Sequence, residues 1–356
     1  MIIGLNKLDW QQVLTALNNF DKSKIDEYLK QVYYDHYHNQ YKNFLQAIIP
    51  GLAISKIKLK NETWDYLIKN LHLKDGKISS KTTYTIFNFN SSLNLSNEQI
   101  NYLIKNSELS DISDIKEEDF FLKEIKLHNV LSTALRCNKD NNLNLTKSQW
   151  VYLFQNSNLN EYVPKKDCYH YHNYDDYPPL LTALRVNNKN NLLFDEEMWD
   201  FLIKNSDLKF VADDNMTALL SACHHIRVER IKMFDETWQY LIDNSDLSSC
   251  NYFNWNSLML ACNNDMKLNL IKKIVDKMNE QKVPLFPLKG KIRSEEYIKE
   301  KVNNLLQRIN NNKNLEQEKK QLQETIDKKT LAITEVNKKI AKLRSSNQKS
   351  QNKKIK

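Results

Sequence analysis

The sequence predicts an all-α protein: a solenoid of helix pairs followed by a long C-terminal helix or coiled coil. Three observations carry this prediction. A phrase typified by DETWQYLIDNSDL at residues 235–247 occurs five times, only four glycines and six prolines occur among 356 residues, and apolar residues from Leu315 onward follow a four-three spacing. Scarcity of glycine and proline favours helices over loop-rich β folds. A repeated unit of this length is typical of helical arrays, and the four-three spacing is typical of coiled coils.

The repeated phrase has the pattern of a helix that is buried on more than one side. Its copies are anchored, at intervals of 36, 50, 49 and 39 residues, at Trp64, Ile100, Trp150, Trp199 and Trp238. Relative to this anchor, position +2 is aromatic, +3 is leucine and +4 is isoleucine or phenylalanine in every copy. Positions 0, +3 and +4 share one helical face, and +2 points away from it. We therefore expect each of these helices to lie between neighbouring helices.

Both ends of this helix are marked in the sequence. Ser96 with Gln99 and Thr146 with Gln149 have the spacing of a capping box, and Asp195 occupies the equivalent place. Position +6 is asparagine in all copies, at Asn70, Asn106, Asn156, Asn205 and Asn244. Because asparagine tolerates the left-handed conformation that closes many helices, we expect it to end the helix in that conformation. Three residues later a leucine is expected to turn the chain back onto the core, at Leu73, Leu109, Leu159, Leu208 and Leu247.

A second apolar segment precedes most copies. STALRCN, LTALRVN, MTALLSACHH and NSLMLACNN combine alanine with leucine, which suits a short helix packed closely on its partner. Between this segment and the repeated helix, positions −7 and −5 are apolar, which indicates an extended connector with alternate side chains pointing inward. Each unit is thus expected to consist of a first helix, a connector and a second helix. No such unit can bury its faces alone.

The first-helix segments resemble a known repeat family. TAL at residues 133–135, 182–184 and 217–219, and LMLACNNDMKLNLIKKIV at 258–275, are similar to the TPLHLA helix and second helix of ankyrin repeats. The resemblance covers roughly residues 45–282 and about five to six repeats, and it lacks the turn glycines of ankyrin repeats. A longer connection between the helices and a Trp at the start of the second helix are further departures. The resemblance implies a protein that binds other proteins and has no catalytic activity.

Two units contain extra residues after the repeated helix, at 108–128 and 158–180. Long loops on one face of a helical array often form its contact surface. The second loop is rich in tyrosine and histidine, and tyrosine supplies interface energy at low entropic cost. The alternative is that these rings only pack the loop against the array. The predicted partner-binding residues are Tyr162, Tyr169, His170, Tyr171, His172, Tyr174 and Tyr177.

The C-terminal region has the heptad pattern of a coiled coil. Seven of nine seam positions between residues 315 and 343 are apolar, and Lys319 and Lys329 fill the other two. A homodimer through residues 315–343 is therefore expected, and isoleucine at three a positions favours a parallel one. A lone amphipathic helix folded back on the repeats is the alternative. The predicted divisions are an N-terminal helical capping region (1–44), the repeats (45–282), a linker (283–300), a coiled-coil helix (301–344) and a basic disordered tail (345–356).

The charge distribution disfavours nucleic-acid binding by the repeats. From Lys313 onward Lys and Arg outnumber Asp and Glu by 13 to 5, which accounts for the whole net charge of +8. Residues 1–312 are therefore neutral and offer no basic track for phosphates. The opening MIIGLNKLDWQQV lacks the features of a signal peptide, and no apolar stretch is long enough to span a membrane. We expect a soluble, unprocessed chain.

Composition and motifs also limit the compartments in which the protein is expected and the reactions that it is expected to catalyse. Five scattered cysteines without CxxC spacing indicate a reducing compartment, so we expect a cytoplasmic protein. High Asn, Lys and Ile content resembles that of proteins from AT-rich genomes, including those of intracellular bacteria that deploy ankyrin-like proteins against host factors, so a secreted effector exported into a host cell is a further expectation. No GxSxG, HExxH, Walker or GxGxxG motif occurs, so we expect no enzymatic activity and no cofactor. The alternatives are a metal-dependent enzyme using Cys168, His170 and His172, and a structural oligomer assembled by the coiled coil.

Overall fold

The computed structural model describes residues 2–4, 9–35, 40–71, 77–109, 130–160, 177–190, 192–212, 214–225, 231–287, 292 and 294–354. These residues are mostly helical, as predicted, and the chain divides into two compact units, Met1–Arg293 and Ser294–Lys356. Among the described residues, no helix is both long enough and apolar enough to cross a membrane.

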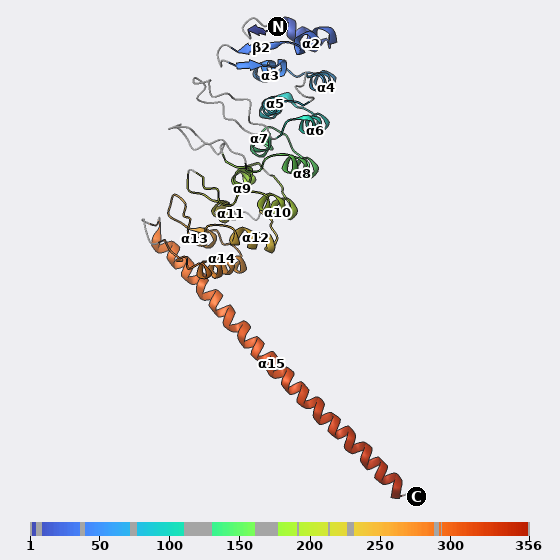
Figure 1. The fold of residues 1–356 in the computed structure, drawn as a ribbon, viewed down its shortest axis with the longest axis vertical. Coiled ribbons are helices and arrows are strands. Elements are labelled where there is room, and N and C mark those ends of the chain that lie inside the picture. Colours follow the sequence, from blue (N-terminus) through green and yellow to red (C-terminus); the bar gives the residue numbers. More distant parts are fainter. Residues whose placement is uncertain are drawn as a thin grey trace. The chain divides into compact units, whose positions relative to one another are not determined.

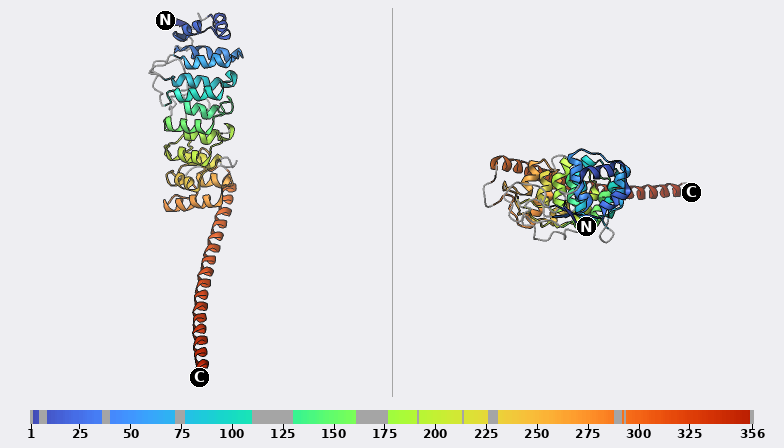
Figure 2. Two further views of the ribbon diagram at one scale, coloured as in Figure 1. Left: turned by 90° about the vertical axis from the view of Figure 1, so that its right-hand side faces the viewer. Right: turned by 90° about the horizontal axis from the view of Figure 1, so that it is seen from above.

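The first unit contains two rows of helices (Figure 1). The first-helix row consists of α3 (Phe44–Ile54), α5 (Ser80–Leu93), α7 (Val130–Cys137), α9 (Pro179–Asn190), α11 (Ala218–His225) and α13 (Ser257–Asn263). The second-helix row consists of α4 (Asn61–Lys69), α6 (Asn97–Asn106), α8 (Lys147–Asn156), α10 (Glu196–Lys204), α12 (Asp235–Asp243) and α14 (Leu268–Glu280). Successive helices within each row contact one another, so that the pairs follow one another as layers (Figure 2). Between α8 and α10 the contact includes the stacked rings of Phe154 and Phe201.

The anchor residues of the repeated phrase form the core between these layers. All five anchors are buried, and so are the leucine at +3 and the apolar residue at +4 in every copy. The aromatic residues at +2 are partly exposed. The predicted burial of the tryptophan-bearing face is therefore confirmed at each position. Three indole nitrogens have no hydrogen-bond partner, those of Trp64, Trp150 and Trp199.

Apolar connectors also enter this core, as the alternation at −7 and −5 predicted. Phe194 lies between two layers, with ring centroids 5.1 Å from Trp150, 5.3 Å from Phe154 and 5.3 Å from Trp199, all in edge-to-face geometry. Its neighbour Leu193 is 78% exposed, whereas Phe194 is 3% exposed. Leu193 has a φ of 53°, so the expected extended connector is wrong at this residue, although Leu192 and Phe194 on either side of it are buried. The connector thus joins adjacent repeats through aromatic contacts.

The predicted helix starts are confirmed. Ser96 and Gln99 form a reciprocal capping box at the start of α6, and Thr146 and Gln149 form another at the start of α8. At the start of α10, the Asp195 side chain accepts a hydrogen bond from the Met198 amide. Each cap satisfies an amide that the helix itself leaves unpaired.

The predicted left-handed helix end is wrong. Asn70, Asn205 and Asn244 have φ between −106° and −103°, and no +6 asparagine has a positive φ. Instead, the side-chain amide of every +6 asparagine donates to the carbonyl oxygen four residues earlier, at 2.7–2.8 Å. At Asn70, Asn205 and Asn244 the same carbonyl oxygen also accepts the asparagine's backbone amide, so the side chain adds a second hydrogen bond to the last turn of the helix. Leucines that follow fold back as predicted: Leu109, Leu159, Leu208 and Leu247 are buried. Leu73 lies outside the described residues.

Asparagine side chains also link the first helices of adjacent units. The Asn141 amide donates to the carbonyl oxygens of Phe87 and Asn88 at 3.1 and 2.8 Å, near the end of α5. In return, the Asn90 amide donates to the Asn141 carbonyl oxygen at 3.1 Å. These bonds cross the boundary between the two layers. They help to fix the register between neighbouring repeats.

The N-terminal region contains a small sheet besides the predicted helices. Strands β1 (Ile2–Gly4), β2 (Val32–Asp35) and β3 (Gln40–Lys42) accompany α1 (Trp10–Asn18) and α2 (Lys22–Leu29). β1 pairs with β2 in parallel, and β2 pairs with β3 in antiparallel orientation. Strands of three or four residues are too short for a reliable alternation pattern, which is why the sequence predicted a purely helical cap. The Trp10 ring packs against Gly51, where an added Cβ would lie 2.5 Å from it.

The second unit is formed by one helix, α15 (Glu295–Lys354). It begins inside the predicted linker and continues through the predicted coiled-coil segment into the segment predicted to be a disordered tail. Residues 345–354 contain neither glycine nor proline, so nothing in the local sequence stops the helix.

Candidate functional site

The predicted binding loop joins α8 to α9, and the structure describes its two ends. Residues 161–176 lie outside the described part, and with them the predicted positions Tyr162, Tyr169, His170, Tyr171, His172 and Tyr174. Cys168 of the alternative metal site lies in the same segment. Tyr177, the last predicted position, is described and partly buried at the start of α9.

Tyr177 lies against a buried arginine. The Cζ atom of Arg185, in α9, is 4.0 Å from the centroid of the Tyr177 ring. The Arg185 side chain is 3% exposed, and its Nη2 lies 2.8 Å from Oδ1 of Asp214. A buried guanidinium requires a charged or aromatic partner, and here it has both. The ion pair ties α9 to the turn that precedes α11.

Asp214 belongs to a tight turn that the next repeat reproduces. The Ala212 amide donates to the Met216 carbonyl oxygen at 3.0 Å, and Asn215 between them has φ 60°. Before α13, the Asn251 amide donates to the Trp255 carbonyl oxygen at 2.9 Å, and Asn254 has φ 60°. Asparagine therefore takes the left-handed conformation in these inter-repeat turns, where glycine would otherwise be expected. Two consecutive loops consequently share one backbone shape.

These loops and two helices line an open cavity of about 160 Å³. Its lining residues are Arg185, Asp214, Met216, His224, His225, Asn251, Tyr252 and Phe253. The volume is below the roughly 300 Å³ at which pockets for small-molecule ligands begin, so it suits a single side chain. Tyr252 is 81% exposed at its edge, with its ring 5.4 Å from that of Phe253.

Two histidines line the cavity as neutral groups at pH 7. His224 and His225 end α11, with perpendicular rings 4.8 Å apart. Burial and the nearby Arg185 lower the pKa of His224, while burial, His224 and Arg185 lower the pKa of His225 to about 4. The carbonyl oxygens of Cys223 and His224 accept hydrogen bonds at 2.9 Å from the Asn264 side chain of the next unit. Asn264 therefore donates the hydrogen bonds to these carbonyl oxygens at the end of α11.

The described residues of this cluster have their charges paired or suppressed. Its charged groups, Arg185 and Asp214, form an ion pair, and its imidazoles are held neutral. Across the described part of the chain, no group of three or more His, Cys, Asp or Glu side chains can hold a metal ion. The Cys168, His170 and His172 hypothesis concerns residues outside that part.

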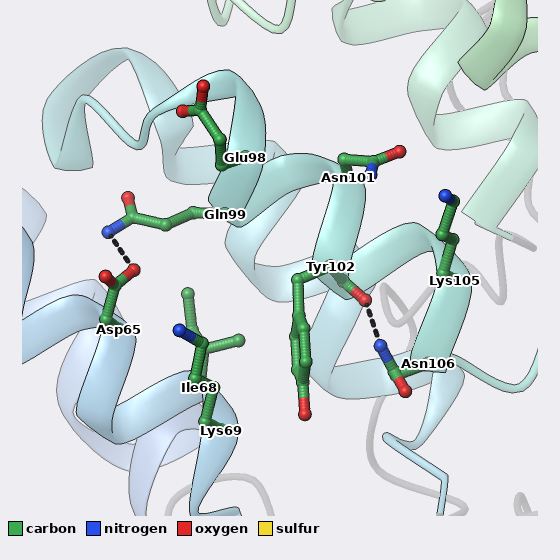
Figure 3. Close-up of a pocket in the computed structure, with 9 residues that line it drawn as sticks. All are labelled: Asp65, Ile68, Lys69, Glu98, Gln99, Asn101, Tyr102, Lys105 and Asn106. Carbon is green, nitrogen blue, oxygen red and sulfur yellow. Dashed lines mark hydrogen bonds between the residues drawn. The ribbon is translucent and has the colours of Figure 1, made fainter.

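A second concave feature lies between α4 and α6 (Figure 3). It measures about 280 Å³ and is lined by Asp65, Ile68, Lys69, Glu98, Gln99, Asn101, Tyr102, Lys105 and Asn106. Figure 3 shows the Gln99 side chain reaching across to Asp65, and its amide donates to that carboxylate at 2.9 Å. The same amide donates to the Asn61 carbonyl oxygen at 3.1 Å. These bonds join two successive second helices, so we interpret the groove as a contact between repeats.

Sequence reasoning missed the residues that surround Tyr177. Arg185 belongs to the LTALRVN segment that helped to define the repeat. Its partner Asp214 is remote in sequence and lies in another repeat. The aromatic phrase NYFNW at 251–255, which contains Tyr252, was the available signal for an exposed loop. Comparison with known proteins adds no identification, because neither a family model nor a curated protein matches this chain.

Proposed function

We propose that this chain is a non-enzymatic protein-interaction scaffold, a solenoid of five to six ankyrin-like helix-pair repeats that binds a protein partner through its inter-repeat loops. The observation that carries the proposal is the loop face at the Arg185 cavity. The buried Arg185 forms an ion pair with Asp214 in this face, and the exposed Tyr252 lies beside a cavity large enough for one side chain.

Physical reasoning supports recognition at this face. Tyrosine buries a large area on binding while losing few rotatable bonds, and interface energy concentrates in such residues beside well-formed pockets. The loop backbone below Tyr252 is held by turn hydrogen bonds, including those from the Phe253 and Trp255 amides to the Asn251 side chain, both 3.0 Å. A preorganised loop loses less entropy when a partner docks. The tyrosine-rich segment 161–176 immediately precedes Tyr177 in the sequence, and we propose that it contributes to binding the same partner.

The proposed compartment is the reducing cytoplasm, of the producing cell or of a host cell. Cys223 and Cys250 are free thiols in the described part of the chain. Burial raises the pKa of the Cys223 thiol, which keeps it unreactive. Free, scattered thiols suit a compartment where disulfides do not persist.

The test is affinity capture with the full chain, followed by quantitative mass spectrometry of the captured proteins. Two variants are compared with wild type: Tyr252→Ala, and replacement of residues 161–176 by a short Gly/Ser linker. Each variant is expected to capture less of the same protein partner. The linker variant keeps buried Leu159 and Tyr177, so the flanking packing is retained.

Tyr297→Ala is the matched control, because Tyr297 is also an exposed tyrosine but lies in α15. It is expected to retain the partner. A partner captured equally by wild type, Tyr252→Ala and the linker variant would refute this choice of surface. Capture lost equally with Tyr297→Ala would show that the effect is not specific to the loop face.

A further inference from the structure

The second unit leaves a row of large apolar side chains exposed. On α15, the exposed apolar residues include Leu315, Leu322, Ile326 and Leu331. Leu315, Leu322 and Ile326 are separated by seven and four residues and lie on one helical face. A row of this kind marks an interaction surface rather than scattered surface apolarity.

This face has the register of a coiled-coil seam. With Ile326 at heptad position a, Leu315 and Leu322 occupy d, and the sequence continues the seam with apolar residues at positions 333, 336, 340 and 343. Lys319 at a and Lys329 at d interrupt it. Leu331 falls at f, on the opposite side of the helix from the seam. A seam of more than four heptads is long enough for a second helix to cover it.

We propose that a second copy of this chain covers the seam, with the two α15 helices antiparallel. Charge decides the orientation. A parallel in-register pair places Lys319 opposite Lys319 and Lys329 opposite Lys329, so that two pairs of like charges meet at the seam. β-branched residues at a favour the parallel form, but they do not remove this repulsion.

In the antiparallel register that places residue 322 opposite residue 333 of the second copy, no lysine lies directly opposite another lysine, and the two Lys329 side chains fall in adjacent layers of the seam. Lys319 then lies opposite position 336, which is valine, and Lys329 lies opposite Ile326 of the second copy. Each lysine can direct its charge to solvent while its aliphatic stem covers an apolar neighbour. The two units formed by residues 1–293 would attach at opposite ends of the seam.

Sedimentation equilibrium of the full chain, over a hundredfold range of concentration, tests self-association. Wild type is expected to approach twice the monomer mass of 42.2 kDa. Leu322→Glu is expected to remain monomeric at every concentration. Leu331→Glu is the matched control, because its leucine is 68% exposed against 62% for Leu322 and differs only in heptad position. It is expected to dimerise like wild type.

A monomeric wild type would overturn the proposal, and so would equal loss of dimer in Leu322→Glu and Leu331→Glu. Orientation is measured between nitroxide labels on Lys313→Cys, with Cys168 and Cys250 replaced by serine. At 1.5 Å per residue, the antiparallel register separates the two labelled positions by about 44 Å along the axis. A parallel pair places them at one level, within about 20 Å. The short distance would overturn the antiparallel arrangement.

Discussion

Replacement of Phe194 by alanine removes the ring that joins the α8 layer to the α10 layer. Phe194 makes three edge-to-face contacts, to Trp150, Phe154 and Trp199, with centroids 5.1–5.3 Å apart. It is 3% exposed, so the truncation leaves a cavity that water cannot fill favourably. The ring contacts that are lost lie between two repeats and not within one helix.

The size of the effect follows from burial and from the ring contacts. Truncation of a buried phenylalanine to alanine costs about 3–5 kcal/mol. Each edge-to-face pair adds about 0.5–1.5 kcal/mol beyond buried area, and Phe194 has three, so the upper part of that range is expected, about 4–5 kcal/mol. In a stacked array, weakening one boundary also separates the units on either side. Unfolding is therefore expected to broaden or to split into two transitions.

Urea unfolding followed by tryptophan fluorescence and by far-ultraviolet circular dichroism measures both effects. The adjacent Leu193→Ala is the control, because Leu193 is 78% exposed and its truncation is expected to change the free energy of unfolding by less than about 0.5 kcal/mol. A loss below about 1 kcal/mol in Phe194→Ala would refute the argument. Equal losses in the two variants would do the same.

Three further substitutions test other parts of the structure. Asn205→Gly is expected to cost about 1 kcal/mol in urea titration, because the side-chain hydrogen bond to the helix carbonyl is lost; a stabilising effect would instead favour a left-handed helix end. Asp214→Asn is expected to cost about 2 kcal/mol, because Arg185 stays buried without its carboxylate, and the double variant with Arg185→Met should recover part of this loss. His225 has its pKa lowered to about 4 by burial, His224 and Arg185, while the unfolded value is about 6.5. The unfolded state therefore binds more protons between these values, so the free energy of unfolding should fall as pH is lowered from 7 to 5, and less in His225→Gln.

The sequence predicted the repeated helices because their signals are local or periodic. Trp150 keeps a fixed phase with the leucine and phenylalanine that follow it, so its burial was predictable from helical geometry alone. Thr146 and Gln149 lie three residues apart, and their reciprocal hydrogen bonds depend on nothing outside that turn. Both predictions are confirmed by the structure.

Other features depend on contacts that a single segment does not contain. Asparagine can end a helix through its backbone or through its side chain, and sequence alone does not distinguish these routes; Asn205 uses its side chain, while Asn94 ends α5 in the left-handed conformation. Helix α5 is rich in Thr, Ser, Asn and Phe, which are poor helix formers, and its helical state depends on packing against α3 and α7. The ion pair of Arg185 and Asp214 joins different repeats, so no local sequence pattern predicted it.

The proposed solenoid rests on one physical claim: neighbouring repeats bury one another's tryptophan faces, and no repeat is stable alone. The most direct measurement compares two fragments by circular dichroism and thermal unfolding. Residues 130–287, which hold four consecutive helix pairs, are expected to be helical and to melt cooperatively. Residues 177–212, which hold one pair with Trp199, are expected to be largely unfolded. A cooperative, helical fold in the single-pair fragment would contradict the claim.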